Sequence, residues 1–172
     1  MARDRRPLFF AILILGLALD QAVKAWVRGH FFEHQTPGYP WPNVFELTLT
    51  YNRGVAFGMM QGRGIFMTPI AIGIAGYAIW FALKNPHETK WTITMAALMA
   101  CGALGNLYDR LVLHQVTDMF WFRLIDFPVF NVADSCITVA TVMLIISWLR
   151  ESIQKDHSPS PPSPATEGNE PS

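Results

Sequence analysis

The sequence lacks the short motifs that mark many metal-dependent and serine-dependent hydrolases. No HExxH, CxxC or GxSxG segment occurs in its 172 residues, and no acidic, histidine or cysteine cluster has metal-ligand spacing. The chain has only two cysteines, Cys101 and Cys136, and both lie in apolar stretches. We therefore expect two small buried side chains instead of a disulfide, and neither a metal nor a cofactor.

The sequence also lacks an excess of charge of either sign. Its 13 basic and 13 acidic residues give a formal net charge of zero at pH 7. No basic stripe with interleaved aromatic residues is present, although nucleic-acid-binding proteins use such stripes to contact phosphates. We therefore expect no nucleic-acid partner.

Hydrophobic residues make up 51% of the chain and are concentrated in four runs. Each run is about 20 residues long, which is the length that crosses the hydrocarbon core of a bilayer. The predicted spans cover residues 8–27, 64–83, 91–111 and 131–149. The sequence thus predicts an all-α integral membrane protein with four transmembrane helices.

The N-terminal run resembles a secretory signal peptide, because Arg3, Arg5 and Arg6 precede it. However, no clean A-x-A cleavage site follows, and the helical pattern continues to Val27, so we predict a retained first span. Basic clusters mark the cytoplasmic side of a membrane protein. With an even number of spans, both termini are expected in the cytoplasm.

The segments 28–62 and 112–129 are then expected outside. In the first of them, Val44–Tyr51 is rich in β-branched and aromatic residues and predicts a short strand. The sequence NRGVAFG follows at 52–58, and its glycines permit a tight turn or close approach to a ligand. We therefore predict a small extramembrane β-containing platform on the outer side.

Two domains of unequal kind follow from this pattern. Residues 1–150 form the predicted four-helix membrane domain. Residues 151–172 are predicted to be a disordered cytoplasmic tail, because they become rich in proline and serine after position 158.

Polar side chains gather near the predicted outer ends of the spans. Asp20 lies in the outer half of the first span, Asn106 and Asp109 near the end of the third, and Asn131 and Asp134 at the start of the fourth. Ionisable groups within a membrane are costly and usually face a cavity, find a partner or do chemistry. Their convergence at one depth predicts a functional site there.

Paired carboxylates are the chemistry that this composition supports best. Two aspartates that share a site cannot both ionise easily, so one keeps a proton while the other acts as a base on water. The leading candidates are Asp134, which shares a helical face with Asn131, and Asp118, which has no basic neighbour in its loop. Spacing alone does not show that these two aspartates meet.

The other aspartates have simpler interpretations. Asp109 adjoins Arg110 and is predicted to be a structural or positioning group. Asp126 precedes Phe-Pro and is predicted to be solvated. Asp20 is expected to be a satisfied hydrogen-bond partner within its helix, and a contact between Asp20 and substrate stays open.

Other chemistries remain as alternatives. Ser135 and Lys24 could form a Ser–Lys pair, but a lysine at this position is expected to extend towards the membrane interface. Cys136 with His114 has no sign of thiol activation. A small transporter with a proton relay, or a non-catalytic assembly subunit, would also carry intramembrane acids. Against the transporter, the second span has no charged residue.

Five sequence blocks resemble those of the bacterial lipoprotein signal peptidases (signal peptidase II). They are LDQAVKAWV, TYNRGVAFG, GNLYDR, VTDMF and FNVADS, and they occur in the family's order between residues 8 and 149. The resemblance implies a four-helix membrane bundle and an aspartic endopeptidase whose catalytic dyad is Asp118 and Asp134. It also implies that six residues line or brace the site: Asp20, Asn52, Gly54, Asn106, Arg110 and Asn131.

The resemblance further implies the substrate and the location. The substrate would be a prolipoprotein that carries a diacylglyceryl group on a cysteine, cleaved just before that cysteine. We expect a monomer in the bacterial cytoplasmic (inner) membrane, in contact with membrane lipids. Its active site is expected near the outer, periplasmic face.

Overall fold

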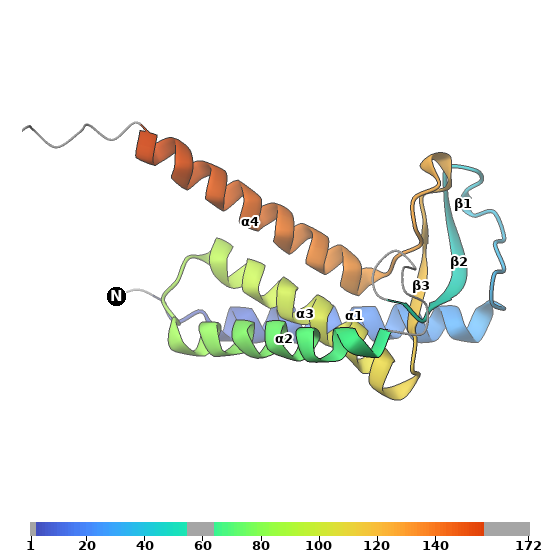
Figure 1. Cartoon of the computed structure of the whole chain (residues 1–172), viewed down its shortest axis with the longest axis horizontal. Helices are drawn as coiled ribbons and strands as arrows, with labels where there is room; N and C mark the ends of the chain where they lie inside the picture. Colours follow the sequence, from blue (N-terminus) through green and yellow to red (C-terminus); the bar gives the residue numbers. More distant parts are fainter. Residues whose placement is uncertain (1–2, 55–63, 157–172) are drawn as a thin grey trace, which may run out of the picture.

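The computed structural model describes residues 3–54 and 64–156 (Figure 1). Within these residues the four predicted spans are all helical. The helices are α1 (Arg6–His30), α2 (Met67–Lys84), α3 (Lys90–Val112) and α4 (Val132–Asp156). Helix α4 continues past the predicted end at residue 149, so residues 151–156, which were predicted to belong to the tail, are helical instead. The rest of the predicted tail lies outside the described residues.

Three of these helices are long and apolar enough to cross a membrane: Arg6–His30, Met67–Lys84 and the Val132–Gln154 part of α4. Helix α3 is more polar because Asn106, Asp109 and Arg110 lie in its last two turns. It packs against α1, α2 and α4, so the other helices shield much of its surface. The bundle is therefore built around α3.

Small residues on α3 let its neighbours approach closely. A Cβ atom on Gly102 would lie 2.4 Å from the backbone oxygen of Ala133 in α4. A Cβ atom on Gly105 would lie 2.7 Å from Oδ2 of Asp20 in α1. Helices approach this closely only where side chains are absent or small. Gly102 and Gly105 therefore allow α4 and α1 to pack closely against α3.

The two cysteines are free thiols in the apolar core between the helices, a cluster that includes Phe9 and Leu13 of α1. Cys101 of α3 is fully buried, and its Sγ lies 2.6 Å from where a Cβ atom on Gly16 would stand. Cys136 of α4 is partly buried against the same apolar cluster. Cys101 is the small buried side chain that we expected, whereas Cys136 remains partly exposed.

The outward faces of the bundle are apolar. Large aliphatic and aromatic side chains are exposed along α1, α2 and α4, where water would make them costly. Helices that are apolar on all sides are typical of membrane proteins. Examples are Ile14, Leu15, Leu19, Ile72, Trp80, Leu144, Ile145 and Trp148.

An antiparallel sheet lies at one end of the bundle, where α1 and α3 end and α4 begins (Figure 1). Its strands are β1 (Pro40–Trp41), β2 (Phe45–Asn52) and β3 (Val116–Trp121), in the order β1-β2-β3. Strand β2 confirms the strand predicted from the sequence. Strand β3 was not predicted, although VTDMFW has the β-branched and aromatic composition of a strand.

Apolar contacts fix the sheet to the bundle. Val27 and Phe31 at the end of α1 form one cluster with Leu49 of β2 and Met119 of β3. Successive side chains of a strand point to opposite faces. When Met119 faces α1, its neighbour Asp118 must therefore face the other way.

An ion pair between buried Glu46 and exposed Arg123 holds the end of the sheet where β1 lies. Glu46 of β2 is fully buried and accepts hydrogen bonds of 3.0 and 3.1 Å from Arg123 Nη1 and one of 2.5 Å from the backbone N–H of Asn43. Arg123 belongs to a short 3₁₀ helix, η2 (Arg123–Ile125), that follows β3. The pair thus ties β2 to the segment between β3 and α4.

Candidate active site

The start of α4 places Asp134 through a reciprocal cap. The N–H of Asp134 donates to Oδ1 of Asn131 at 2.9 Å, and the N–H of Asn131 donates to Oδ2 of Asp134 at 3.2 Å. This is the geometry of a capping box, with Asn and Asp in the two positions. Asp134 therefore lies in the first helical turn, where the helix dipole favours a negative charge.

Strand pairing places Asp118 beside this cap. Asp118 lies opposite Thr50 in β2 and is 3% exposed. Asn131 Nδ2 donates to Asp118 Oδ1 at 2.6 Å, and Asn52 also hydrogen-bonds the Asp118 carboxyl group. Asn131 consequently contacts Asp118 with its side chain and Asp134 with its backbone. The structure brings together the two aspartates that the sequence could not connect.

The surroundings of Asp118 favour its protonated form. Burial raises the pKa of Asp118 to about 8, and the negative charge of Asp134 acts in the same direction. Hydrogen bonds from Asn131 and Asn52, and the positive charge of Lys24, oppose the rise in pKa. At neutral pH, Asp118 therefore keeps its proton in most molecules.

Asn106 of α3 connects Asp134 and Asn131 to Lys24 of α1. Its Nδ2 donates to Asp134 Oδ1 at 2.7 Å. Its Oδ1 accepts from Asn131 Nδ2 at 3.0 Å and from Lys24 Nζ at 3.2 Å. The side-chain amides of Asn106 and Asn131 thus form a continuous hydrogen-bonded network that contacts both Asp118 and Asp134.

The expectation that Lys24 extends to the membrane interface is wrong. Lys24 is fully buried, and its Nζ lies 2.9 Å from Asp20 Oδ2 and 3.3 Å from Asp109 Oδ2. Asp20 precedes it by one turn on the same face of α1, so two carboxylates compensate the ammonium inside the bundle. Ser135 Oγ instead donates to the Asn131 carbonyl at 3.0 Å. The described contacts of Lys24 therefore do not support a Ser–Lys pair.

Asp20 and Asp109 each satisfy a backbone N–H on another element. Asp20 Oδ1 accepts from the N–H of Ala133 at 2.9 Å, which is one of the N–H groups left free at the start of α4. Asp109 Oδ2 accepts from the N–H of Thr117 at 2.9 Å and so joins α3 to β3. The hydrogen-bonding role expected for Asp20 is confirmed. Asp109 pairs with Lys24 and not with its neighbour Arg110.

The remaining site residues predicted from the sequence lie around this network. Arg110 Nη1 lies 3.4 Å from the Asn106 carbonyl, and the guanidinium is attracted by Asp118 and Asp134. Its Nε is buried and has no hydrogen-bond partner among the described residues. The N–H of buried Gly54 donates to Asn52 Oδ1 at 2.8 Å. Residues 55–58 of the predicted turn lie outside the described part of the chain.

Asp126 lies apart from the site, as we expected. It is exposed and has a left-handed backbone conformation (φ 47°) at the end of η2. The sequence analysis missed Lys24 as a site residue. The spacing of Asp20 and Lys24, four residues apart on one helix, was the signal that could have revealed the buried pair.

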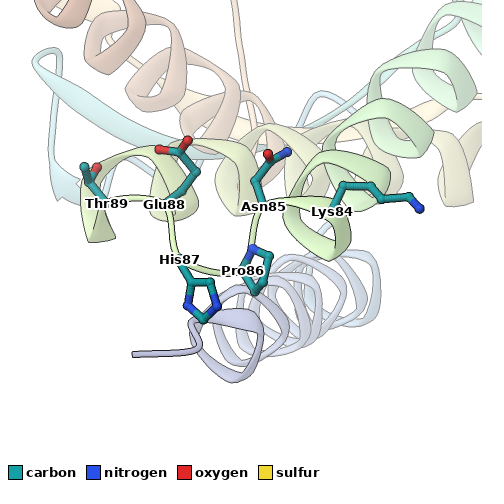
Figure 2. A pocket seen from close by; sticks show the side chains of 6 residues that line it. All are labelled: Lys84, Asn85, Pro86, His87, Glu88 and Thr89. Carbon is teal, nitrogen blue, oxygen red and sulfur yellow. The ribbon is translucent and has the colours of Figure 1, made fainter. Parts of the chain in front are cut away.

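A separate hollow of about 380 Å³ lies at the turn between α2 and α3, where six side chains line it (Figure 2). This turn is at the opposite end of α3 from the sheet (Figure 1). The side chains that line the hollow include one carboxylate, that of Glu88, and therefore provide no carboxylate pair for aspartic catalysis. The lining residues are Lys84, Asn85, Pro86, His87, Glu88 and Thr89.

Across residues 3–54 and 64–156, no group of three or more His, Cys, Asp or Glu side chains could hold a metal ion. The polar groups that converge are amides, one ammonium, one guanidinium and carboxylates. Such a set can move protons and stabilise developing charge without a further group.

The fold is one of apolar helices that surround a cluster of polar side chains. Two solved structures described as a bacterial membrane enzyme have this fold. One has a TM-score of 0.82 at 25% identity and covers 94% of this chain and 99% of its own. The other has a TM-score of 0.76 at 26% identity and covers 87% and 97%.

Residues 12–150 match the family described as Signal peptidase (SPase) II, and the chain belongs to this family. Lipoprotein signal peptidases of Streptococcus pyogenes serotypes M5 and M6 are each 36% identical to it over 147 residues. These matches cover 86% of this chain and 96% of each relative. The family resemblance found in the sequence is confirmed, and the protein is a protease.

Proposed function

We propose that this protein removes signal peptides from prolipoproteins that carry a diacylglyceryl group, cleaving just before the modified cysteine. Its family and its relatives, which are lipoprotein signal peptidases, support this substrate class. One observation supports the chemistry above all others: Asn131 contacts both Asp118 and Asp134. Two carboxyl groups held by one residue, Asp118 buried and Asp134 partly buried, form the pair that an aspartic peptidase requires.

The two carboxyl groups have different roles. Asp118 carries the shared proton at neutral pH, because burial raises its pKa to about 8. Asp134 is the base, because the start of α4 and the donor groups of Asn106 and Asn131 stabilise its negative charge. Different environments thus divide one pair into an acid and a base.

The reaction then proceeds in two steps. Asp134 takes a proton from water as the water oxygen attacks the scissile carbonyl carbon, while Asp118 gives its proton to the carbonyl oxygen. In the second step the C–N bond breaks and the amine leaves with the proton held by Asp134. The new carboxyl group of the product forms as Asp118 takes back a proton from a hydroxyl group of the tetrahedral intermediate.

Arg110 and Asn52 are positioning groups in this reaction. The buried Nε–H of Arg110 can donate a hydrogen bond to a carbonyl oxygen of the substrate. Asn52 holds Asp118 from β2, and the Gly54 N–H in turn fixes Asn52. Asp20 braces the start of α4 through Ala133.

The membrane arrangement follows from the same proposal. Helix α3 also crosses the membrane, shielded by α1, α2 and α4, which makes four spans in total. The sheet lies on the outer side of a bacterial cytoplasmic membrane. Both termini are cytoplasmic, so the site is near the outer face, where the lipid chains of the substrate can stay in the bilayer. The protein acts as a monomer, with membrane lipids and prolipoproteins as its partners.

The test is cleavage of a diacylglyceryl-modified prolipoprotein peptide by purified protein in detergent or proteoliposomes. Asp118→Asn and Asp134→Asn should each abolish cleavage without loss of folded protein, since asparagine can neither take nor return the proton. The matched control Asp126→Asn, at an exposed aspartate, should cleave at the normal rate. Activity should also fall as pH rises through about 8, where Asp118 loses its proton.

A chelator is a second control in the same assay. It should leave the rate unchanged, which separates a carboxyl pair from metal-assisted hydrolysis. Near-normal cleavage by well-folded Asp118→Asn or Asp134→Asn would refute the aspartic mechanism.

A further inference from the structure

We propose that Lys24 is a positioning residue for the reaction, which helps to orient the two amides that hold Asp118 and Asp134 and supplies a positive charge to them from α1. The proposal rests on the proposed function, because it concerns how the carboxyl pair is held. It gives a buried ion pair a role beyond stability.

The orientation argument starts from the ammonium, which can only donate hydrogen bonds. The atom of Asn106 that faces Lys24 at 3.2 Å must therefore be Oδ1. The other end of the same amide, Nδ2, then faces Asp134 and donates to it. Without Lys24, the Asn106 amide could reverse and present its oxygen to the Asp134 carboxylate.

The orientation passes to the second amide. Since Asn106 Oδ1 is an acceptor, Asn131 must face it with Nδ2, at 3.0 Å. The same Nδ2 donates to Asp118, and the remaining Oδ1 accepts from the N–H of Asp134. The N–H of Asp134 requires this same orientation of Asn131, so Lys24 orients Asn106 directly and reinforces the orientation of Asn131.

The charge of Lys24 also reaches the pair. Contacts of 3.2, 3.0 and 2.6 Å lead from Lys24 through Asn106 and Asn131 to Asp118, so the charge lies within about 9 Å. Two other charged groups act on the pair: Asp20 of α1 acts on Asp134, and Arg110 of α3 acts on both aspartates. Asp109 of α3 lies beside Lys24 and Arg110. Lys24 opposes the rise in the pKa of Asp118. At an effective dielectric constant of about 20, its removal should raise that pKa by about one unit.

Lys24→Met and Lys24→Gln are the variants that test this role. Both remove the charge, and glutamine keeps a neutral donor. In the prolipoprotein cleavage assay, kcat should fall about ten- to a hundred-fold with KM within about two-fold of normal. The basic limb of the pH profile should move up by about one pH unit. The control Lys84→Met, at an exposed lysine of α2, should change neither.

A purely structural Lys24 would lower the amount of folded enzyme and leave the pH profile where it is. Lys24→Arg keeps the charge and should return the basic limb towards its normal position. An unmoved limb in folded Lys24→Met and Lys24→Gln would overturn the proposal, as would failure of every Lys24 variant to fold. If Asp118→Asn and Asp134→Asn are inactive in the same assay, such a result refutes the role of Lys24 alone and leaves the proposed function standing.

Discussion

Gly102 is the position where a single added methyl group should disturb the site most directly. Its Cβ atom would lie 2.4 Å from the Ala133 backbone oxygen and 2.4 Å from Ile137 Cγ1. Ile137 can change its rotamer, whereas the Ala133 oxygen belongs to the first turn of α4 and cannot move alone. Reaching an ordinary contact distance therefore requires α3 and α4 to separate by about 1 Å.

This separation has a cost in stability and a larger one in activity. Overpacking of this kind destabilises a protein by about 1–3 kcal/mol, against which the better helix propensity of alanine returns up to about 1 kcal/mol. The site loses more, because Asn106 is on α3 and Asp134 on α4, joined by a contact of 2.7 Å. A displacement of about 1 Å can lower a rate by about a hundred-fold.

Thermal unfolding in detergent and the prolipoprotein cleavage rate measure the two effects for Gly102→Ala. Gly73→Ala in α2 is the matched control, because nothing lies within 4 Å of its added Cβ. The control should keep its rate and gain slightly in stability. If Gly102→Ala kept both the Tm and the rate of the unmodified protein, the close approach of α3 and α4 would not determine the geometry of the site.

Two further predictions concern pH and topology. Because the pKa of Asp118 rises from an ordinary 3.8 to about 8 on folding, the folded state holds a proton there that the unfolded state releases. The contribution of Asp118 to stability is complete below about pH 4 and is lost as pH rises to about 8. The Tm of the unmodified protein should therefore fall more steeply over this pH range than the Tm of Asp118→Asn. Equal slopes of Tm against pH in the two proteins would contradict the raised pKa. Both termini are expected in the cytoplasm, so a reporter fused after Arg150 should be active on the cytoplasmic side, and activity only on the outer side would reverse the topology.

Much of the fold was predictable because its cause is local. Runs of about 20 apolar residues must form helices in a bilayer, since only then are their backbone groups satisfied. The residues of β2 likewise carry their own strand signal. Helix α4 was predicted too short because the sequence beyond residue 149 is polar, although a helix can continue into solvent when its backbone hydrogen bonds are intact.

Strand β3 shows where local reasoning was insufficient. The sequence analysis places its residues in the outer segment 112–129 without a strand. It forms because β2 offers a partner edge and because Val27 and Phe31 of α1 cover Met119. That partner is more than 60 residues away in the chain, so the pairing is a property of the fold.

The candidate site divides in the same way. The sequence by itself determined the family and the residue types, since Asp118, Asp134, Asn106 and Asn131 were all named from their motifs. Only the tertiary structure decided that Asn131 contacts both aspartates and that Lys24 is buried beside Asn106. The physical reason is that hydrogen bonds and ion pairs of about 3 Å depend on how helices pack and strands register. Here the packing is set by Gly102 and Gly105 of α3, and the register by the pairing of β3 with β2, which lies more than 60 residues earlier in the chain.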